Sequence, residues 1–264
     1  MRKLTLDQIK DIQLSILKTV DAFCRANGIK YTLAGGTLIG AVRHKGYIPW
    51  DDDIDIYMLR KDYERFVNEF TTQNHKVYTY QNCDYYNMSF AKVSDERTVM
   101  NEYLLDMKSI GINIDVFPVD NIPDNEFRAK FFMKCAWLYR KASDYKRFLV
   151  LKDKGAIKNV ILRIYKILVY PISLKLLSRR INQIATKYAG QSTKYVGNVI
   201  HGYGSKERCL NIGWDKHIEM EFEGEKFLVI SSYDTYLKNV FGDYMTPPPI
   251  EKQVSCHDYE AFVK

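Results

Sequence analysis

Apolar side chains recur every three or four positions near the N-terminus, which is the spacing of one buried face of an α-helix. These positions are Ile9, Ile12, Ile16, Val20 and Phe23. Thr5 and Gln8 stand at capping-box spacing before this run, and Asn27 with Gly28 supplies a stop signal behind it. The pattern therefore predicts a helix between Thr5 and Asn27.

Short apolar segments bounded by turn residues follow, and they are typical of β-strands. IKYTL at residues 29–33 runs into Gly35 and Gly36, and the TLIGAV that comes next predicts a helix beginning at this diglycine turn. After a polar loop, Ile54 and Ile56 alternate with aspartates, which predicts another strand.

The same mixture continues through the first half of the chain. KDYERFVNEF, residues 61–70, places its apolar side chains on one face and predicts a helix. Three strand-like segments then follow, separated by polar turns: residues 76–80, 88–94 and 112–120. We therefore predict an α/β (α+β) fold with a mixed sheet.

The second half of the chain has a different pattern. Residues 127–190 are mostly helical and basic, with breaks at Gly155 and Pro171. KFLVI, YDTYLKNVFGDY and TPPP then predict a strand, a short helix and an irregular tail. We predict a catalytic core at 1–126, an inserted basic helical subdomain at 127–190, and a segment at 191–264 that packs back on the core.

The composition is that of a globular protein. With 264 residues, 46% apolar and 27% charged, the chain suits one domain with an appended subdomain. The N-terminus, MRKLTLDQIKDIQ, lacks the continuous apolar core of a signal peptide or membrane span, so we expect a cytoplasmic location. Five scattered cysteines favour reduced, buried thiols over a disulfide framework or a zinc site.

The net charge of +7 is unevenly distributed along the chain. Residues 128–187 hold sixteen Lys and Arg against two acids, Asp144 and Asp153, a local excess of +14 that leaves −7 for the remainder. This asymmetry indicates an anionic partner on one side of the molecule. Membrane surface and nucleic acid are the usual candidates, and we expect no nucleic acid because no nucleic-acid-binding motif is present.

Residues 152–180 have the pattern of a helix that lies on an anionic membrane surface. Lys158, Arg163 and Lys166 recur on one arc at helical spacing, with mostly apolar residues elsewhere. The apolar runs are too interrupted to span a bilayer, but each basic residue near an anionic leaflet contributes about 1 kcal/mol. The alternative is a set of helices that pack on the core with snorkelling basic ends.

The segment IPWDDDIDIYM, residues 48–58, places four aspartates in five positions. On a strand, Asp53 and Asp55 point to one face about 7 Å apart at Cα and can converge on one cation. Mg²⁺ prefers carboxylate, water and phosphate oxygens, so the pair implies a phosphorylated substrate. Asp115 in INIDVF is a third carboxylate, a candidate general base or ligand of a second ion. A solvated turn is the alternative for the aspartate run.

The residues before the aspartates fit phosphate binding. Gly35, Gly36 and Thr37 at a helix start combine bare backbone, which permits close approach, with free N–H donors. Arg43 and His44 are candidates for neutralising phosphate charge. The alternatives are a tight strand-to-helix turn and a solvated basic loop.

Three motifs in order carry a family resemblance. They are LAGGTLIGAVRHKGYIPWDDDIDIYM, GINIDVFPVDNIPD and FGDYMTPPP. Together they resemble the LicD family of phosphotransferases, whose fold is that of the nucleotidyltransferase superfamily. The resemblance covers roughly residues 5–125 and 220–260, and the basic helical stretch carries little motif.

The resemblance implies an activity and its partners. It implies Mg²⁺-dependent transfer of a substituted phosphate, such as phosphocholine, from a CDP-activated donor such as CDP-choline. The acceptor would be a sugar hydroxyl on a lipid-linked or polymeric cell-surface glycan: teichoic acid, lipopolysaccharide or a capsule precursor. Two ions and substitution by Mn²⁺ are compatible with this chemistry, and a peripheral position at the inner face of the cell membrane suits such an acceptor.

The resemblance also assigns roles by motif position. Asp53 and Asp55 become metal ligands, and Asp115 becomes the third catalytic carboxylate. The donor phosphates would be held by Gly35, Gly36, Thr37, Arg43 and His44. Asp51 is a further candidate ligand if the strand starts early, whereas Asp52 points to the opposite face. His257 and the GDYM stretch match the family's tail without a derived role.

Other functions remain open at this point. A nucleotidyltransferase would use the same carboxylates but leave the nucleoside monophosphate on a small hydroxylated acceptor. A catalytically silent membrane- or RNA-binding module would use them only structurally. The transferred group is open as well: aromatic residues including Tyr47, Trp50, Tyr85 and Tyr86 could enclose choline, but ethanolamine, ribitol or glycerol phosphate would serve the same chemistry.

Overall fold

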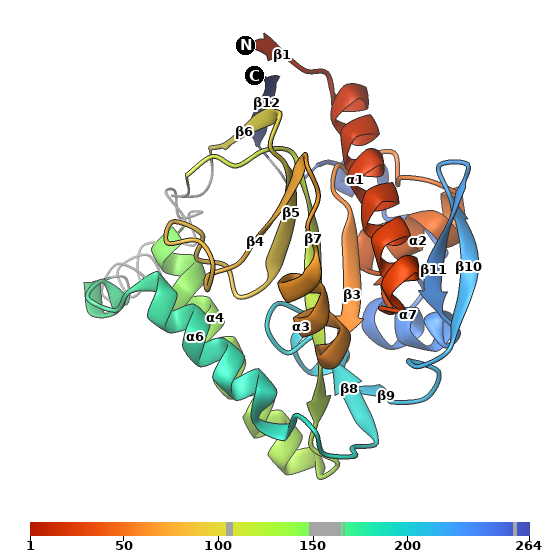
Figure 1. The fold of residues 1–264 in the computed structure, drawn as a ribbon. Coiled ribbons are helices and arrows are strands. Elements are labelled where there is room, and N and C mark those ends of the chain that lie inside the picture. The colour runs from red at the N-terminus through yellow and green to blue at the C-terminus, as the bar shows by residue number, and fades with distance from the viewer. Residues whose placement is uncertain (104–107, 148–164, 166, 256–257) are drawn as a thin grey trace.

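A mixed β-sheet forms the centre of the protein (Figure 1). The structure is a computed structural model that describes residues 1–103, 108–147, 165, 167–255 and 258–264. The sheet runs in the order β2 (Thr32–Leu33), β3 (Asp55–Leu59), β7 (Asn113–Ile122), β5 (Ala91–Asp95) and β4 (His75–Tyr78). Beyond this path, β7 also pairs with β8 (Tyr195–Gly197), which pairs with β9 (Cys209–Leu210). β3 and β7 are parallel and the other pairs are antiparallel, which confirms the predicted α+β class.

The N-terminal helix α1 (Leu6–Asn27) begins and ends as predicted. The Thr5 hydroxyl accepts a hydrogen bond from the Gln8 backbone N–H at 3.3 Å, and the Gln8 side chain accepts one from the Thr5 N–H at 3.1 Å. Gly28 ends the helix in the left-handed conformation at φ 62°. Ile16 and Val20 on the predicted face are fully buried, so the apolar face of α1 joins the core.

Two short helices follow the strands that position the aspartates. α2 (Gly35–His44) begins at the diglycine turn, and α3 (Arg60–Glu69) follows β3 directly, both as predicted. The predicted strand around Asp53 is shorter than expected. β3 begins only at Asp55, which is its first residue in register with β7, and the residues before it have register partners on neither β2 nor β7. Asp53 therefore lies in the segment that leads into the sheet.

The basic half contains a pair of helices that lie side by side, α4 (Glu126–Arg147) and α6 (Leu174–Ala185), followed by the short 3₁₀ helix η1 (Thr186–Tyr188) (Figure 1). Their inner faces join the main hydrophobic core through residues such as Phe132 and Ile181. Much of residues 152–180, including Lys158, Arg163 and Lys166, lies outside the described residues. The division into a core and an inserted subdomain stays a prediction.

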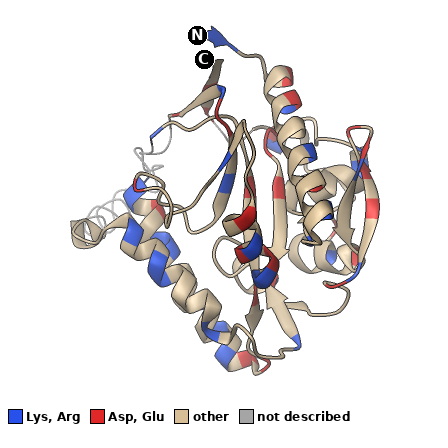
Figure 2. Cartoon of the chain, in the orientation of Figure 1, with Lys and Arg blue, Asp and Glu red and all other residues tan. Residues whose placement is uncertain are grey.

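Basic residues recur along both helices of this pair (Figure 2). α4 and α6 together carry ten Lys or Arg and only two acids, Glu126 and Asp144. Among the described residues, no helix combines the length and apolar character needed to cross a bilayer.

The C-terminal part packs back on the core. A hairpin of β10 (His217–Phe222) and β11 (Glu225–Ile230) precedes α7 (Tyr233–Phe241), and the Ile230 N–H donates to the Thr32 hydroxyl of β2 at 3.0 Å. The short 3₁₀ helices η2 (Gly204–Glu207) and η3 (Ile250–Lys252) flank this unit.

The tail after α7 is not wholly irregular, contrary to the prediction. β12 (Tyr259–Val263) pairs with β1 (Arg2–Lys3) on one side and with β6 (Thr98–Glu102) on the other. These partners are remote in sequence, so the short YEAFV segment alone carried too weak a signal for a strand. The pairing joins both ends of the chain to one small sheet.

Candidate active site

Asp55 and Asp115 lie side by side at one edge of the parallel strand pair. Asp55 is the first residue of β3, and Asp115 is its register partner on β7. The Asp55 backbone N–H donates to the Thr37 hydroxyl at 2.9 Å, and the Asp115 N–H donates to the Ile54 carbonyl at 2.8 Å. The structure therefore brings two of the three predicted catalytic carboxylates together.

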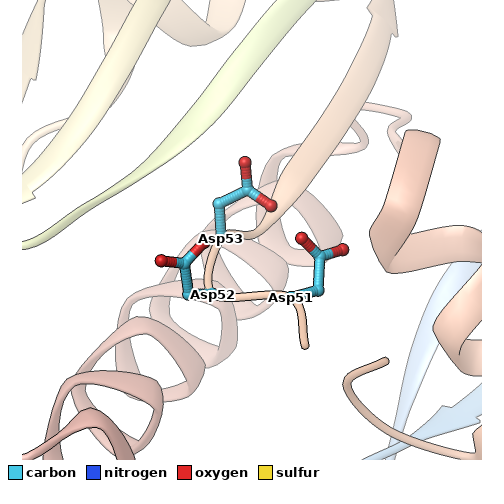
Figure 3. A group of neighbouring side chains, drawn as sticks. All are labelled: Asp51, Asp52 and Asp53. Carbon is cyan, nitrogen blue, oxygen red and sulfur yellow. The ribbon is translucent and has the colours of Figure 1, made fainter. Parts of the chain in front are cut away.

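The three successive aspartates form a second group directly before β3. Oxygen atoms of Asp51, Asp52 and Asp53, one from each, lie within 4.8 Å of one another. Figure 3 shows their carboxylates on the same side of the chain. Asp53 also acts electrostatically on Asp55, which links this group to the strand pair.

The prediction that Asp52 points away from the others is wrong. Strand alternation does not apply to it, because residues 51–53 precede β3. Its side chain is only 6% exposed, and Oδ2 accepts a hydrogen bond from the Ser255 hydroxyl at 2.9 Å. Its backbone carbonyl accepts another from the Gln13 amide at 3.0 Å. Asp52 thus fastens the C-terminal segment to the aspartate loop.

The diglycine turn lets the carboxylates approach the start of α2. A Cβ at Gly35 would lie 3.0 Å from Asp55 Oδ2, and Gly35 has a φ of +52°. A Cβ at Gly36 would lie 2.2 Å from Asp51 Oδ2. Glycine is required at both positions, and the helix N-terminus favours the negative charge placed there. The predicted role of this turn in holding donor phosphates stays a prediction.

The electrostatics of the group fit a divalent cation. Burial, followed by the charges of Asp53 and Asp115, raises the pKa of Asp55 well above its usual value, which favours the protonated form of this carboxyl. An all-carboxylate donor set suits hard, oxygen-preferring ions such as Mg²⁺ and Mn²⁺. A cation among these oxygens would remove the repulsion and allow Asp55 to ionise.

Lys92 belongs to the site but was not among the predicted residues. It lies on β5 opposite Asp115, and its Nζ is 2.5 Å from Asp115 Oδ1 and 2.9 Å from Asn113 Oδ1. Burial is the largest single influence and acts to lower the pKa of Lys92, but the charge of Asp115, the charge of Glu102 and the hydrogen bond to Asp115 together outweigh it, and the pKa is raised. The sequence did contain a signal for this residue: Lys92 lies inside the apolar strand segment MSFAKVS. Lysine is rarely buried unless it is paired, so this position indicates a paired lysine.

Arg43 and His44 lie at the opposite end of α2, about 12 Å along the helix axis from Gly35. Arg43 donates to the Tyr244 carbonyl at 2.9 Å, and its guanidinium carbon lies 6.0 Å from the Trp50 ring centroid. The His44 and Trp50 ring centroids are 6.4 Å apart. Burial lowers the pKa of both side chains. Arg43 Nε also donates to His44 Nδ1 at 3.3 Å, and the contact of both side chains with donor phosphates stays a prediction.

Two of the predicted choline-enclosing aromatics have structural roles. Tyr86 is 1% exposed, and its hydroxyl donates to the Phe90 carbonyl at 3.0 Å. Tyr47 packs on Phe222 with ring centroids 5.0 Å apart. Tyr244 of the GDYM stretch also has a structural contact, because its carbonyl accepts the hydrogen bond from Arg43. His257 lies outside the described residues.

Sequence similarity relates this site to known proteins. A family profile described as LicD/FKTN/FKRP, nucleotidyltransferase domain, matches residues 28–151. The lipopolysaccharide cholinephosphotransferase LicD of Haemophilus influenzae is 33% identical over 279 aligned positions that cover 100% of both chains. The ribitol 5-phosphate transferase FKRP of Mus musculus is 49% identical over 37 residues, 14% of this chain and 8% of FKRP. The chain therefore belongs to the LicD family of phosphotransferases.

Proposed function

We propose that the protein transfers phosphocholine from CDP-choline to a sugar hydroxyl of a lipid-linked or polymeric cell-surface glycan. The full-length similarity to a lipopolysaccharide cholinephosphotransferase supports both the transferred group and the class of acceptor. The observation that carries the proposal is the register pairing of Asp55 with Asp115 beside the aspartate loop and the N-terminus of α2. This is the arrangement that a metal-assisted phosphoryl transfer needs.

The proposed site uses these residues in distinct roles. Asp53 and Asp55 would hold the divalent cation, with Asp51 as a further ligand. Bound there, Mg²⁺ or Mn²⁺ would offset the negative charge of the donor's diphosphate and of the departing CMP. The remaining polar groups of the site then act on the acceptor.

Asp115 is the proposed general base. It would accept the proton of the attacking sugar hydroxyl during an in-line displacement at the donor's phosphorus. Lys92 would hold the Asp115 carboxylate in place through the 2.5 Å contact and favour its ionised form. If a second ion binds, Asp115 is its candidate ligand.

The direct test is incubation of the purified protein with CDP-choline, Mg²⁺ and an acceptor glycan. Release of CMP together with choline phosphate on the glycan supports the proposal, and EDTA should abolish both. Nucleotide on the acceptor would instead indicate a nucleotidyltransferase, in line with the description of the matched family profile. No turnover with any CDP-linked donor would exclude phosphotransfer from such donors.

Ribitol phosphate is the second candidate for the transferred group. The similarity to the ribitol 5-phosphate transferase FKRP supports it, although it is confined to 37 residues. A donor panel of CDP-choline, CDP-ethanolamine, CDP-ribitol and CDP-glycerol separates the candidates, since the preferred donor should have the highest kcat/KM.

For the location, we propose peripheral attachment at the inner face of the cell membrane. The ten Lys and Arg residues of α4 and α6 support it, and residues 152–180 were the predicted contact. Flotation with vesicles tests the idea: the protein should float with vesicles rich in anionic lipid and remain unbound with zwitterionic ones, and binding should weaken as salt increases.

A further inference from the structure

A row of aromatic side chains lies next to the carboxylates on the same face of the sheet. Tyr57 is two residues beyond Asp55, and Phe117 is two residues beyond Asp115. Residues two apart on a strand share a face and lie about 7 Å apart, and Tyr57 pairs with Phe117 in register. A segment that packs on this aromatic row therefore lies next to the position where a metal-bound phosphate would bind.

The segment of residues 198–203 covers the aromatic row. The His201 ring stacks on Phe117 with centroids 5.4 Å apart and an interplanar angle of 19°. The Asn198 amide donates to the Tyr57 hydroxyl at 3.1 Å. Tyr203 at the end of the segment is 58% exposed and packs edge to face on Phe241 at 4.9 Å. The segment thus presents an exposed aromatic ring beside the candidate active site.

A buried carboxylate, Glu207, holds this segment in place. Glu207 is 0% exposed, and its two oxygens accept hydrogen bonds from the N–H of Tyr203 at 3.2 Å and of Asn198 at 3.4 Å. A Cβ at Gly202 would lie 2.3 Å from Glu207 Cγ, and one at Gly197 would lie 1.9 Å from the Glu207 carbonyl oxygen. The chain therefore packs tightly against both the backbone and the side chain of Glu207.

Burial of this carboxyl is energetically unfavourable. Burial raises the pKa of Glu207 to about 7 against the opposing effects of its backbone hydrogen bonds and of Arg140. No ion pair to Glu207 is found in the described part of the chain, although Arg140 of α4 donates to the neighbouring Gly202 carbonyl at 2.6 Å. Unfavourable buried carboxyls of this kind concentrate at functional sites, where they fix a required geometry.

The surroundings of Tyr203 are acidic. Partial burial and the negative charges of Asp55 and Glu207 raise the pKa of the Tyr203 hydroxyl to about 12. An exposed aromatic ring in a negative field is the environment that binds quaternary ammonium groups, through cation–π attraction and charge. A neutral polyol gains neither the cation–π attraction nor the attraction to the negative charges.

We propose that Tyr203 contacts the quaternary ammonium group carried by the donor's phosphate, and that Glu207 is the positioning residue that holds Tyr203 there. The proposal rests on the proposed function and deepens it, because it assigns the choline-selective contact to a segment far from the aspartate motif in the sequence.

The test compares CDP-choline with CDP-ethanolamine in three variants. Tyr203→Leu should raise KM for CDP-choline about tenfold and leave kcat within about twofold, because the ring binds the head group in ground state and transition state alike. KM for CDP-ethanolamine should change much less, so the preference for choline falls. Tyr203→Phe retains the ring and should behave as the wild type. Glu207→Gln should shift the preference in the same direction as Tyr203→Leu.

The matched control is Tyr139→Leu, which removes a partly exposed tyrosine of α4 and should change neither KM. Melting temperatures of all variants separate folding defects from changes in donor preference. If Glu207→Gln fails to fold, the kinetics of Tyr203→Leu still test the proposal, because Tyr203 is exposed. If the wild type is active and Tyr203→Leu keeps the same preference for choline, the contact assigned to Tyr203 is overturned, but the proposed phosphocholine transfer is not. A wild type that accepts ribitol or glycerol donors but not CDP-choline would overturn the proposed phosphocholine transfer and, with it, this contact.

Discussion

At Asp55, burial and like charge act in the same direction, and both favour the protonated form. Lys92 is the opposing charge, but its described contact is with Asp115. The pair of strands therefore holds one carboxyl, Asp55, whose ionised form is disfavoured, and another, Asp115, that contacts the ammonium group of Lys92. This difference follows from position rather than residue type, because both are aspartates in similar apolar strands.

Asp55→Asn should therefore reduce turnover by at least about a thousandfold without lowering the melting temperature. The amide removes a metal ligand but also removes repulsion from Asp53 and Asp115, which favours the folded state. Steady-state kinetics and thermal unfolding of the same preparation check both parts. Retention of activity would reject the ligand role of Asp55, and Asp53→Asn should give the same loss.

Lys92→Met should lower both activity and stability. Removal of the ammonium leaves the half-buried Asp115 carboxylate without its 2.5 Å partner, a loss of about 3 kcal/mol in the free energy of unfolding. We expect kcat to fall about a hundredfold, since the candidate base loses its orientation. Urea unfolding and kinetics measure the two effects. Lys92→Arg is the control, and it should retain more stability than Lys92→Met.

Glu207 makes stability depend on pH in a direction opposite to that of most carboxyls. Its folded-state pKa of about 7 lies above the usual 4.5, so the folded state binds more protons between these values. Its contribution is greatest below pH 4.5 and is lost as pH rises through 7, by about 3 kcal/mol. Glu207→Gln should therefore gain stability relative to the wild type between pH 5 and pH 8. Urea unfolding at both pH values tests this, and a constant difference would contradict it.

At the scale of elements, the site depends on how α2 begins. β2 has only two residues, and the chain turns into the helix at Gly35 without a side chain to block the carboxylates. The helix therefore approaches the strand pair more closely than other residues at this turn would allow. The sequence predicted this helix start, but it did not reveal that both glycines face aspartates.

Gly36→Ala should disrupt this approach. The new Cβ would lie 2.2 Å from Asp51 Oδ2, so the loop or the helix must move, with a loss of about 1 to 3 kcal/mol in the free energy of unfolding. Metal affinity should fall as well. The clash is absent when Asp51 is also replaced by alanine. The double variant Gly36→Ala/Asp51→Ala should therefore be almost as stable as Asp51→Ala alone. Purely additive losses would show that the clash is not the cause.

At the scale of the whole molecule, segments from both ends of the chain meet at the aspartates. Gln13 of α1 and Ser255 of the tail both bind Asp52, and β12 joins β1 to β6. Ligand binding at the aspartates should therefore stabilise the entire fold, not only one loop.

Addition of saturating Mg²⁺ or Mn²⁺ should raise the melting temperature by roughly 5 °C, because a cation that binds only the folded state adds its binding free energy to stability. Differential scanning fluorimetry with and without EDTA measures the shift. Asp55→Asn should lose most of it. An equal shift in the variant would place the responsible cation elsewhere.

The sequence by itself determined the local features of this protein. Capping residues, apolar periodicity and the alternation of Ile54 and Ile56 with aspartates were sufficient for α1, α2, α3 and the main strands, because each depends on neighbours a few residues away. The motifs were also sufficient for the family. The order of these elements in space was implied only through the family resemblance.

The tertiary structure alone decided which remote groups meet. It placed Lys92 against Asp115, turned Asp52 toward Ser255, and brought the segment held by Glu207 over the row beside the carboxylates. The physical reason is that strand pairing and burial depend on partners far away in the chain, and the charge state of a carboxyl depends on those partners rather than on its neighbours in sequence.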